Sequence, residues 1–474
     1  MISTNTIAQG NAREDGLEII VQLGGTINHA VKSMKWPGQA SVEVALVTIT
    51  KQLWKGQFIL NGNQVKNITA YLDDAETLGN PISLKRNEEK SFQGSSVLGK
   101  GFVLEPNQAN ALIQRNSINK EVVFPYLNGD DLNNSPSQSP SRRVINFFDW
   151  TEAKAKQYPD CYDIIERLVK PERQRWAIDK NENEIVGEYA FRKPLPEKWW
   201  MYADKRPALY RTISDLKRVL VVPKVTKYQT MTFVNSKAVF HDKVVVLSYE
   251  KYCEFLVLQS SLHDEWAKKC SSTLGGLNTL NYIPSECLET FPFPQAIQEE
   301  QQLEAIGEAY HEHRRQLMLG MQLGLTKTYN LFHSNAITDQ SINDKDKQVA
   351  SVQKYLEKTA NTISFDEAIR GIIKLRELHV QMDDAVLDAY GWNDKGLKHD
   401  FYEEDYLPEN DRVRFTIHPD ARKEVLKRLL ELNHKIHEEE KARGLLDKKK
   451  TVSKKSNVLN EPQAGYVGDL FNQE

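Results

Sequence analysis

The stretch MISTNTIAQGNAREDGLEIIVQL (residues 1–23) decides the fold of the first part of the chain. Met1–Thr6 is typical of a short buried strand. Residues 11–23 predict an amphipathic helix, and its candidate core positions are Leu17, Ile19, Ile20 and Leu23. A strand followed directly by such a helix indicates an α/β arrangement.

Two further strand-like runs follow this helix, at Thr26–Ser33 and Ser41–Thr50. The tetrapeptide Lys35-Trp36-Pro37-Gly38 joins them, and its proline and glycine favour a turn. These elements are too few to complete a small α/β sheet. We therefore expect the missing strands to belong to a segment that precedes Met1.

The composition predicts a soluble protein with two or three hydrophobic cores. The chain has 474 residues, of which 40% are hydrophobic and 27% are charged. It has neither an apolar run of the roughly 18 residues that cross a bilayer nor a secretory signal at its start. The four cysteines are never closer than 17 residues, which excludes zinc knuckles and a disulfide framework. We therefore expect a cytoplasmic protein with no membrane contact and no metal site.

The chain divides into four predicted regions. Residues 1–132 are α/β in character, and a Ser-, Pro- and Asn-rich loop separates them from a mixed α+β block at 144–294. The strands predicted in this block are Val219–Pro223, Thr230–Val234 and Val244–Ser248. Residues 295–445 are mainly helical, with clear helical spacing at 299–322 and 420–443, and the lysine-rich residues 446–474 predict a disordered tail.

Positive charge is concentrated in one part of the α+β block. The net charge is only −3, but Tyr189–Val234 contains ten Lys and Arg residues against three acidic ones. Aromatic residues are interleaved with these cations, which is the composition that nucleic-acid-binding surfaces need. A solvated basic face beside an ordinary aromatic core has the same composition, so the pattern leaves both interpretations open.

An ordered set of phrases along nearly the whole chain gives a more specific indication. They include STNTIAQGNAREDGL (3–17), KWPGQASVEVALVTI (35–49), FPYLNGDDLN (124–133), SPSRRVINFFDW (139–150), VKPERQR (169–175), RVLVVPKVTKYQTMTFV (218–234), SLHDEWA (261–267), TFPFP (290–294), GLTKTYNLFH (324–333), VLDAYGW (386–392) and RLLELNHKIHEEEKARG (428–444). Together they resemble the C-terminal part of the large type II restriction–modification adenine-N6 DNA methyltransferases, the class related to combined restriction–methylation enzymes.

This resemblance implies a multidomain α/β and α+β fold. The expected order is an incomplete C-terminal half of a Rossmann-like methyltransferase sheet, an α+β target-recognition domain and a mainly helical C-terminal domain. Such enzymes bind S-adenosylmethionine at a Gly-rich turn and hold a flipped adenine at an Asn-Pro-Pro-Tyr motif. The sequence has no Pro-Pro dipeptide, and Gly99-Lys100-Gly101 lies too far along the chain to be the cofactor turn. We therefore expect the catalytic and cofactor motifs upstream of Met1.

The resemblance also places candidate DNA contacts. Trp36 matches the position of an aromatic residue that stacks on the flipped adenine, although it would equally suit a turn that caps a core. Bases would be read by the segment after the strand VLVVP, with candidates Lys224, Lys227, Tyr228 and Gln229, unless this segment is an ordinary hairpin loop. Phosphate contacts would come from Arg192, Lys193, Lys205, Arg206 and Arg211.

Two histidine-containing clusters do not have the geometry of a site. His311 and His313 lie two residues apart on a predicted helix, so they point away from each other and we expect them on a solvated face. In His263-Asp264-Glu265, consecutive helical residues cannot converge on one ion, which predicts a structural role.

Three functions remain open from the sequence. The first is the recognition half and part of the catalytic half of an adenine-N6 DNA methyltransferase. This half would act on double-stranded DNA together with a separate N-terminal methyltransferase or nuclease polypeptide. The second is a non-catalytic, sequence-specific DNA-binding protein. The third is an inactive, truncated remnant of the enzyme.

Overall fold

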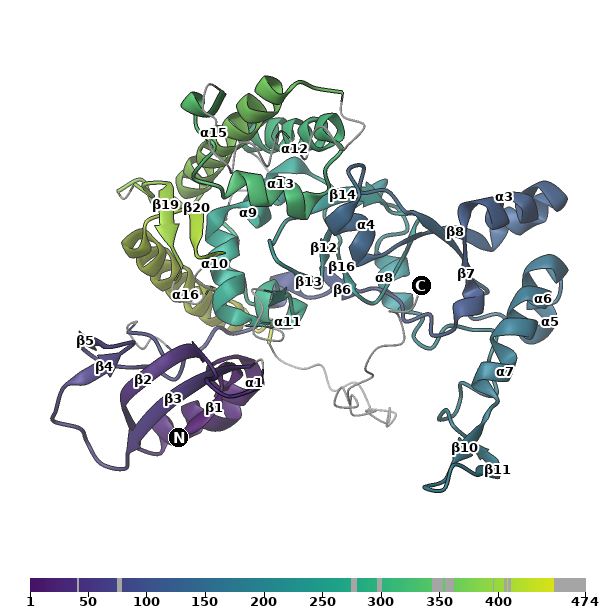
Figure 1. Ribbon diagram of the computed structural model, residues 1–474, viewed down its shortest axis with the longest axis horizontal. Helices are drawn as coiled ribbons and strands as arrows, with labels where there is room; N and C mark the ends of the chain where they lie inside the picture. The colour runs from purple at the N-terminus through teal and green to yellow at the C-terminus, as the bar shows by residue number, and fades with distance from the viewer. Residues whose placement is uncertain are drawn as a thin grey trace.

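The computed structural model describes residues 1–40, 42–74, 79–273, 279–295, 301–342, 353, 362–394, 396–404, 407 and 411–446. Two parts project from one side of a central body, an N-terminal unit and a β-hairpin arm that includes strands β10 and β11 (Figure 1). The predicted tail lies outside the described residues except for Leu446.

The N-terminal unit is a five-stranded sheet in the order β1-β3-β2-β4-β5. Its strands are β1 (Ile2–Thr4), β2 (Thr26–Lys35), β3 (Glu43–Thr50), β4 (Phe58–Leu60) and β5 (Asn63–Val65). The strands predicted before and after the Trp36 turn are confirmed as β2 and β3, which are antiparallel. Within the described chain, β1 pairs only with β3, so its other edge is open.

The helix predicted between β1 and β2 is confirmed as a series of short helical segments. They are Asn5–Ala8, α1 (Gly10–Ala12), the π-helical Arg13–Glu18 and α2 (Ile19–Gln22). Leu17 is fully buried against the sheet, and Ile20 is half-buried. The other predicted core positions are wrong, because Ile19 is 44% and Leu23 is 82% exposed. The predicted burial of β1 is also wrong at Ile2, which is 61% exposed at the open edge of the sheet.

The body contains two four-stranded sheets, in the orders β14-β12-β16-β6 and β15-β8-β9-β7. Their strands are β6 (Ser91–Gln93), β7 (Val103–Leu104), β8 (Val123–Leu127), β9 (Arg142–Ile145), β12 (Arg218–Pro223), β14 (Thr232–Asn235), β15 (Val239–Phe240) and β16 (Val244–Leu247). The three strands predicted in the α+β block are therefore confirmed as β12, β14 and β16. Every residue of β12 except Arg218 is fully buried, as expected for a central strand.

The strand pairing in the body places the first domain boundary earlier in the chain than the sequence predicted. Strand β6 pairs with β16, and β8 pairs with β15, so two strands within residues 91–127 each pair with a strand more than 100 residues later. The prediction that residues 1–132 form one domain is therefore wrong. The sheet of the N-terminal unit ends with β5, and residues 79–90 connect the unit to the body.

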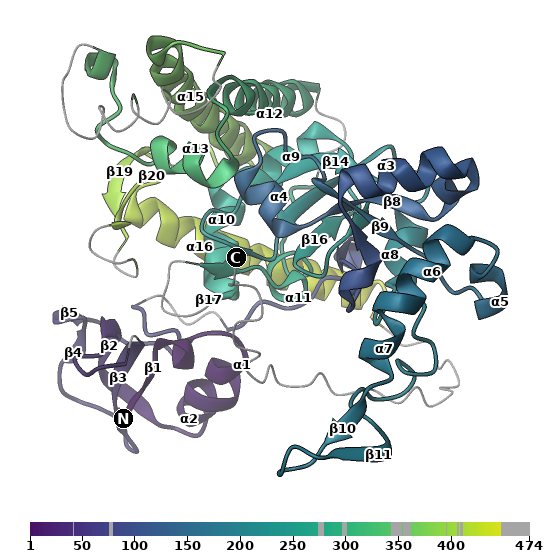
Figure 2. The same ribbon diagram turned by 45° about the vertical axis from the view of Figure 1, so that its right-hand side comes forward.

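The arm side of the body consists of short helices and one hairpin (Figure 2). Its elements are α3 (Pro106–Arg115), α5 (Glu152–Ala155), α6 (Pro159–Leu168), α7 (Lys170–Arg173), β10 (Trp176–Ile178) and β11 (Glu184–Tyr189). Prolines at the first turns of α6 and α7 separate helices within the helical stretch 152–173. At the base of the arm, the buried Arg173 guanidinium donates to the carbonyls of Val97, Leu98, Trp199 and Met201.

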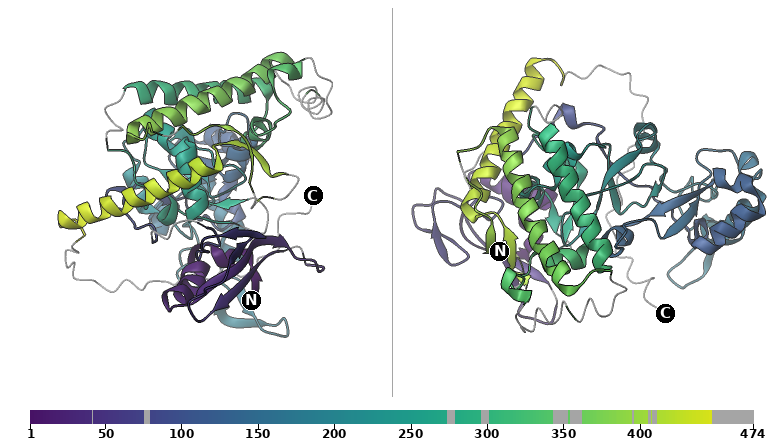
Figure 3. Two further views of the ribbon diagram at one scale, coloured as in Figure 1. Left: turned by 90° about the vertical axis from the view of Figure 1, so that its left-hand side faces the viewer. Right: turned by 90° about the horizontal axis from the view of Figure 1, so that it is seen from above.

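The C-terminal half is helical and shares one hydrophobic core with the body. Its main helices are α9 (Tyr252–Gln259), α10 (Ser261–Cys270), α12 (Gln301–Met321), α13 (Leu325–Phe332), α15 (Phe365–Tyr390) and α16 (Pro419–Ala442), with a hairpin of β19 (Asp400–Glu403) and β20 (Val413–Thr416). Helices α12 and α15 lie side by side, and α16 extends beyond them (Figure 3). This single core contains buried residues from Leu220 to Leu429, so it includes residues on both sides of the boundary predicted at residue 294.

Two predicted absences can be compared with the described residues. None of the described helices is both long and apolar enough to cross a membrane. All four cysteines, which lie among the described residues, are free thiols.

Candidate nucleic-acid interface

A row of hydrogen-bonded polar side chains crosses three strands at the carboxyl end of β1. Asn5, which follows β1, donates from Nδ2 to Ser33 Oγ on β2 at 3.2 Å. Ser33 in turn donates to Glu43 Oε2 on β3 at 3.0 Å. The three side chains are half-buried. Ligands of α/β sheets bind at the carboxyl ends of strands, so this edge of the N-terminal unit is a candidate binding edge.

Trp36 lies at the same end of the sheet, in the turn between β2 and β3. Its backbone N–H donates to Val42 O at 2.9 Å, and its side chain is 37% exposed. A Cβ at Gly38 would lie only 2.4 Å from Nε1 of Trp36, so the ring lies directly over this glycine. The ring is absent from the described hydrophobic cluster of this unit, which argues against the core-capping interpretation. Its exposed face is available for stacking on a flat partner.

The second candidate surface gathers cations around α8 (Pro207–Thr212). We define the α8 patch as Lys205, Arg206, Arg211, Lys217 and Lys237. Lys237 reaches the turn after α8, where its Nζ donates to Ser214 O at 2.6 Å. Lys205 pairs with Asp149, and Arg206 pairs with Asp204, whereas Arg211, Lys217 and Lys237 are exposed. Three exposed cations on adjoining turns form a surface suited to phosphate groups.

Three other predicted contacts lie outside this patch. Arg192 and Lys193 are exposed in the segment that leads back from the arm, and Lys193 pairs with Glu197 at 2.6 Å. Lys224 is half-buried directly after β12, where its backbone N–H donates to Lys243 O at 2.8 Å. The structure therefore does not bring the nine predicted contacts together on one surface.

The predicted base-reading segment is largely covered by the helical half. Tyr228 is 7% exposed, stacks on His333 at 4.9 Å and donates from its hydroxyl to Asn330 at 2.8 Å. Gln229 is 8% exposed, and its Nε2 lies 2.9 Å from His263 Nδ1.

Lys227, beside them, forms an ion pair with Asp411 at 2.8 Å. The expectation that Tyr228 and Gln229 contact bases is therefore corrected, because both side chains are occupied in the interior of the protein. Lys227 is engaged but keeps part of its surface exposed.

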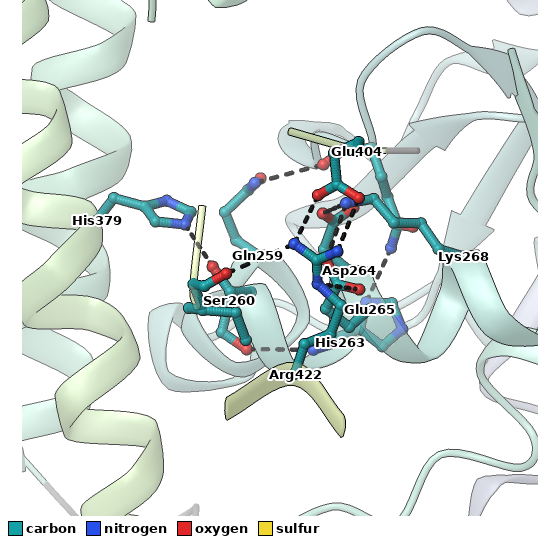
Figure 4. A network of polar contacts seen from close by, with 12 residues as sticks. Gln259, Ser260, His263, Asp264, Glu265, Lys268, His379, Glu404 and Arg422 are labelled. Carbon is teal, nitrogen blue, oxygen red and sulfur yellow. Dashed lines mark hydrogen bonds and ion pairs between the residues drawn. The ribbon is translucent and has the colours of Figure 1, made fainter. Parts of the chain in front are cut away.

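The predicted structural role of His263-Asp264-Glu265 is supported by a buried polar network (Figure 4). Glu265 forms an ion pair with Arg422 of α16 at 3.1 Å and accepts from Lys268 at 3.0 Å, and Arg422 also donates to Glu404. Burial lowers the pKa of His263 to about 3, so its imidazole is neutral and hydrogen-bonded at neutral pH. The network ties α10 to α16, and no group of metal ligands occurs among the described residues.

The solvated face predicted for His311 and His313 is corrected. His311 is 6% exposed beside Phe233 and Phe255, and burial together with the nearby Arg314 lowers its pKa to about 3. His313 points elsewhere, with Nε2 lying 2.8 Å from Gly371 O. Their predicted divergence is therefore observed. The face is buried because α12 packs between α9 and α15.

The glycine pair of Gly99-Lys100-Gly101 packs closely against the end of α6. A Cβ at Gly101 would lie 2.6 Å from Leu168 Cβ, so this glycine is needed for close packing of the turn on the helix.

Sequence reasoning missed two members of the α8 patch. Lys217 lay inside the basic segment but was not singled out, and Lys237 lay just beyond its end. Lys237 could have been identified from the pairing of β12 with β14 as antiparallel strands. In this pairing Arg218 lies opposite Asn235, which places the turn Asn235–Lys237 beside residue 217.

Comparisons with known proteins agree with the body as a recognition unit. Residues 83–295 match the family model described as MmeI, target recognition domain. A solved structure of the Type IIL restriction-modification enzyme MmeI in complex with DNA has a similar fold, with a TM-score of 0.58 and 16% identity. None of the curated proteins matches the sequence. Residues 83–295 are therefore similar to the target recognition domain of MmeI.

The extent of the structural match limits what it shows. The match covers 92% of this chain but only 49% of the MmeI chain. This chain thus spans about half the length of that enzyme. At this level of identity the likeness shows a shared fold.

Proposed function

We propose that this chain is the DNA-recognition half and part of the catalytic half of a site-specific adenine-N6 DNA methyltransferase in a restriction–modification system. The observation that carries the proposal is the MmeI-type target recognition domain at residues 83–295, which joins the N-terminal sheet to the helical half. MmeI itself was solved in complex with DNA, and its fold is shared along 92% of this chain.

In this proposal double-stranded DNA is held by charge around the recognition unit. Arg192 and the α8 patch neutralise phosphates, which positions the duplex without reading its sequence. Lys224 and the exposed part of Lys227 remain candidate contacts at the end of β12. Tyr228 and Gln229 act instead by fixing the segment that carries these lysines.

In the proposal the N-terminal unit contributes the aromatic residue that stacks on the target base. Trp36 presents an exposed ring at the carboxyl edge of the sheet, where an extruded adenine would be held. Extrusion is needed because the amine to be methylated is hidden inside a duplex. The Asn5–Ser33–Glu43 row lies at the same edge and keeps the strands there in register.

In the proposal, further strands complete the sheet of the N-terminal unit. Met1, Ile2, Ile19, Val21 and Leu23 are all between 36% and 82% exposed, which is unusual for apolar residues of one small unit. An open strand edge beside such side chains is a template for further strands. In the proposal these strands carry the S-adenosylmethionine turn and the Asn-Pro-Pro-Tyr motif.

A methyl-transfer assay tests the proposal. The purified chain is incubated with duplex DNA and isotopically labelled S-adenosylmethionine, first alone and then with a polypeptide that carries both missing motifs. We expect no transfer by the chain alone and transfer to adenine after mixing. Transfer by the chain alone would contradict the assignment of the missing motifs. No transfer after mixing, despite formation of a complex, would contradict the catalytic role.

One observation favours a second function. The match to a target recognition domain at residues 83–295 equally suits a DNA-specificity protein without chemistry of its own. Under this alternative the chain binds a specific duplex tightly, but Trp36→Ala leaves that affinity unchanged because no base is extruded. Under the methyltransferase proposal, the same substitution abolishes the fluorescence increase of 2-aminopurine placed at the target adenine.

A further inference from the structure

The segment that joins the N-terminal unit to the body is held by α16, a helix some 350 residues later in the chain. We call residues 79–90 the strap. Asn433 of α16 accepts from Ile82 N at 2.9 Å and donates to Ile82 O at 2.7 Å. Glu440, two turns further along the same helix, accepts from the backbone N–H groups of Lys85 and Arg86 at 2.7 and 3.0 Å. Both side chains are buried, at 0% and 5% exposure.

The strap is bonded on its other side to residues 288–293, a turn followed by the first part of the TFPFP phrase. Asn87 donates from Nδ2 to Leu288 O and Phe291 O, at 2.9 and 2.8 Å. Leu84 N donates to Glu289 O at 2.8 Å. Leu288 O and Phe291 O also accept the backbone N–H groups of Phe291 and Phe293, so Asn87 adds a second donor to each of these carbonyls.

The same strap is bonded to the N-terminal unit itself. Asn80 donates to Glu18 Oε1 at 2.6 Å and accepts from Arg13 at 3.1 Å, while its carbonyl contacts His434 of α16 at 2.8 Å. Two ion pairs continue this contact, Lys423–Asp74 at 3.0 Å and Lys269–Asp73. The ammonium groups of Lys269 and Lys32 outweigh the effect of burial and lower the pKa of Asp73 to about 2.

We propose that α16 is a spacer that sets the separation between the recognition unit and the N-terminal unit on one duplex. Asn433 and Glu440 are its positioning residues. This inference rests on the proposed function, in which both units engage the same DNA. Successive base pairs lie about 3.4 Å apart, so a shift of a few ångströms would present a neighbouring base to Trp36. Backbone groups that side chains of a rigid helix hold in place do not permit such a shift.

The spacing on DNA distinguishes this role from a general contribution to stability. The probe is a duplex that the wild-type chain selects from a randomised pool, and the readout is hydroxyl-radical footprinting of the full chain. The wild type protects two tracts, one under each unit, at a fixed separation. The variant Asn433→Ala/Glu440→Ala still protects the tract under the recognition unit but no longer protects the tract under the N-terminal unit. Its affinity for the duplex falls by less than about tenfold, which corresponds to a loss of at most about 1.4 kcal/mol in binding free energy.

Controls lie on the same helix. Glu438 is 67% exposed and pairs only with Lys441, so Glu438→Ala leaves both tracts unchanged. Glu440→Gln retains an acceptor at this position and restores most of the second tract. The rate of hydrogen exchange at residues 80–90 rises in the double variant and stays unchanged in Glu438→Ala. If the double variant fails to fold, Asn433→Ala alone is tested by the same footprinting and hydrogen-exchange measurements.

Two outcomes would overturn the inference, and they differ. If strap exchange rises while both tracts stay at their wild-type separation, α16 does not set the spacing, and the proposed function is unaffected. If the wild type protects no tract on any selected duplex, the proposed function fails and the inference fails with it.

Discussion

Replacing Arg173 by methionine is expected to destabilise the protein strongly, although this residue has no carboxylate partner. Its guanidinium is fully buried and donates five hydrogen bonds to the carbonyls of Val97, Leu98, Trp199 and Met201. These carbonyls belong to two segments that are about 100 residues apart in sequence. The arginine therefore joins the start of the body to the base of the arm.

The magnitude follows from two opposing effects. A buried acceptor left without a donor costs about 2 kcal/mol, and Arg173→Met leaves four of them. Against this, burial lowers the pKa of Arg173 to about 10, so removing the buried charge returns about 3 kcal/mol. The expected net loss in the free energy of unfolding is therefore about 4–5 kcal/mol. Arg173→Lys keeps a donor at this position and is expected to lose about half as much.

Urea unfolding of the full chain, followed by tryptophan fluorescence, measures this loss. Trp199 and Trp200 lie beside the guanidinium and report on this region. The matched control is Arg175→Met, two residues along, where the side chain is exposed over Phe191 and a change below about 1 kcal/mol is expected. A loss at Arg173 no larger than that of the control would refute the reasoning.

Three further predictions follow from burial and exposure. Gln229→Ala should leave the affinity for duplex DNA within about twofold of wild type and lower the free energy of unfolding by about 1–2 kcal/mol, because the Gln229 amide bonds His263 rather than a base. A large loss of affinity at unchanged stability would contradict the interior role of Gln229. The pKa values of His263 and His311 are lowered from 6.5 to about 3, so protonation favours the unfolded chain. Stability should be complete above about pH 6.5 and fall toward pH 3 by about 1.4 kcal/mol per pH unit for each histidine; a urea midpoint that is constant between pH 6.5 and 5 would disprove this. Leu23→Ser should reduce self-association in light scattering without lowering stability, because the side chain is 82% exposed, whereas a clear loss of stability would show that this leucine packs in a core.

Local sequence patterns predicted most of the regular elements correctly. Alternating and apolar runs located β2, β3, β12, β14 and β16, and helical spacing located α12 and α16. Each of these signals is contained within one element, so it survives without knowledge of the rest of the fold. The order of phrases along the chain also indicated the recognition unit, which the match at residues 83–295 supports.

The errors concern contacts between distant parts of the chain. Nothing around Gln229 indicates that helices 30 to 100 residues later cover it. The pairing of β6 with β16 is likewise invisible in residues 91–93, which is why the first domain was drawn too long. Ile19 and Leu23 have the pattern of core residues, but their burial depends on a surface that the described chain does not supply.

The affinity of the purified chain for duplex DNA as a function of salt concentration tests the central claim most directly. The account predicts binding at low salt that weakens steeply, because each phosphate contact contributes about −0.9 to the slope of log affinity against log salt. Arg192 and the five cations of the α8 patch make six phosphate contacts, which give a slope of about −5. Binding that is absent at low salt, or that does not respond to salt, would contradict the account.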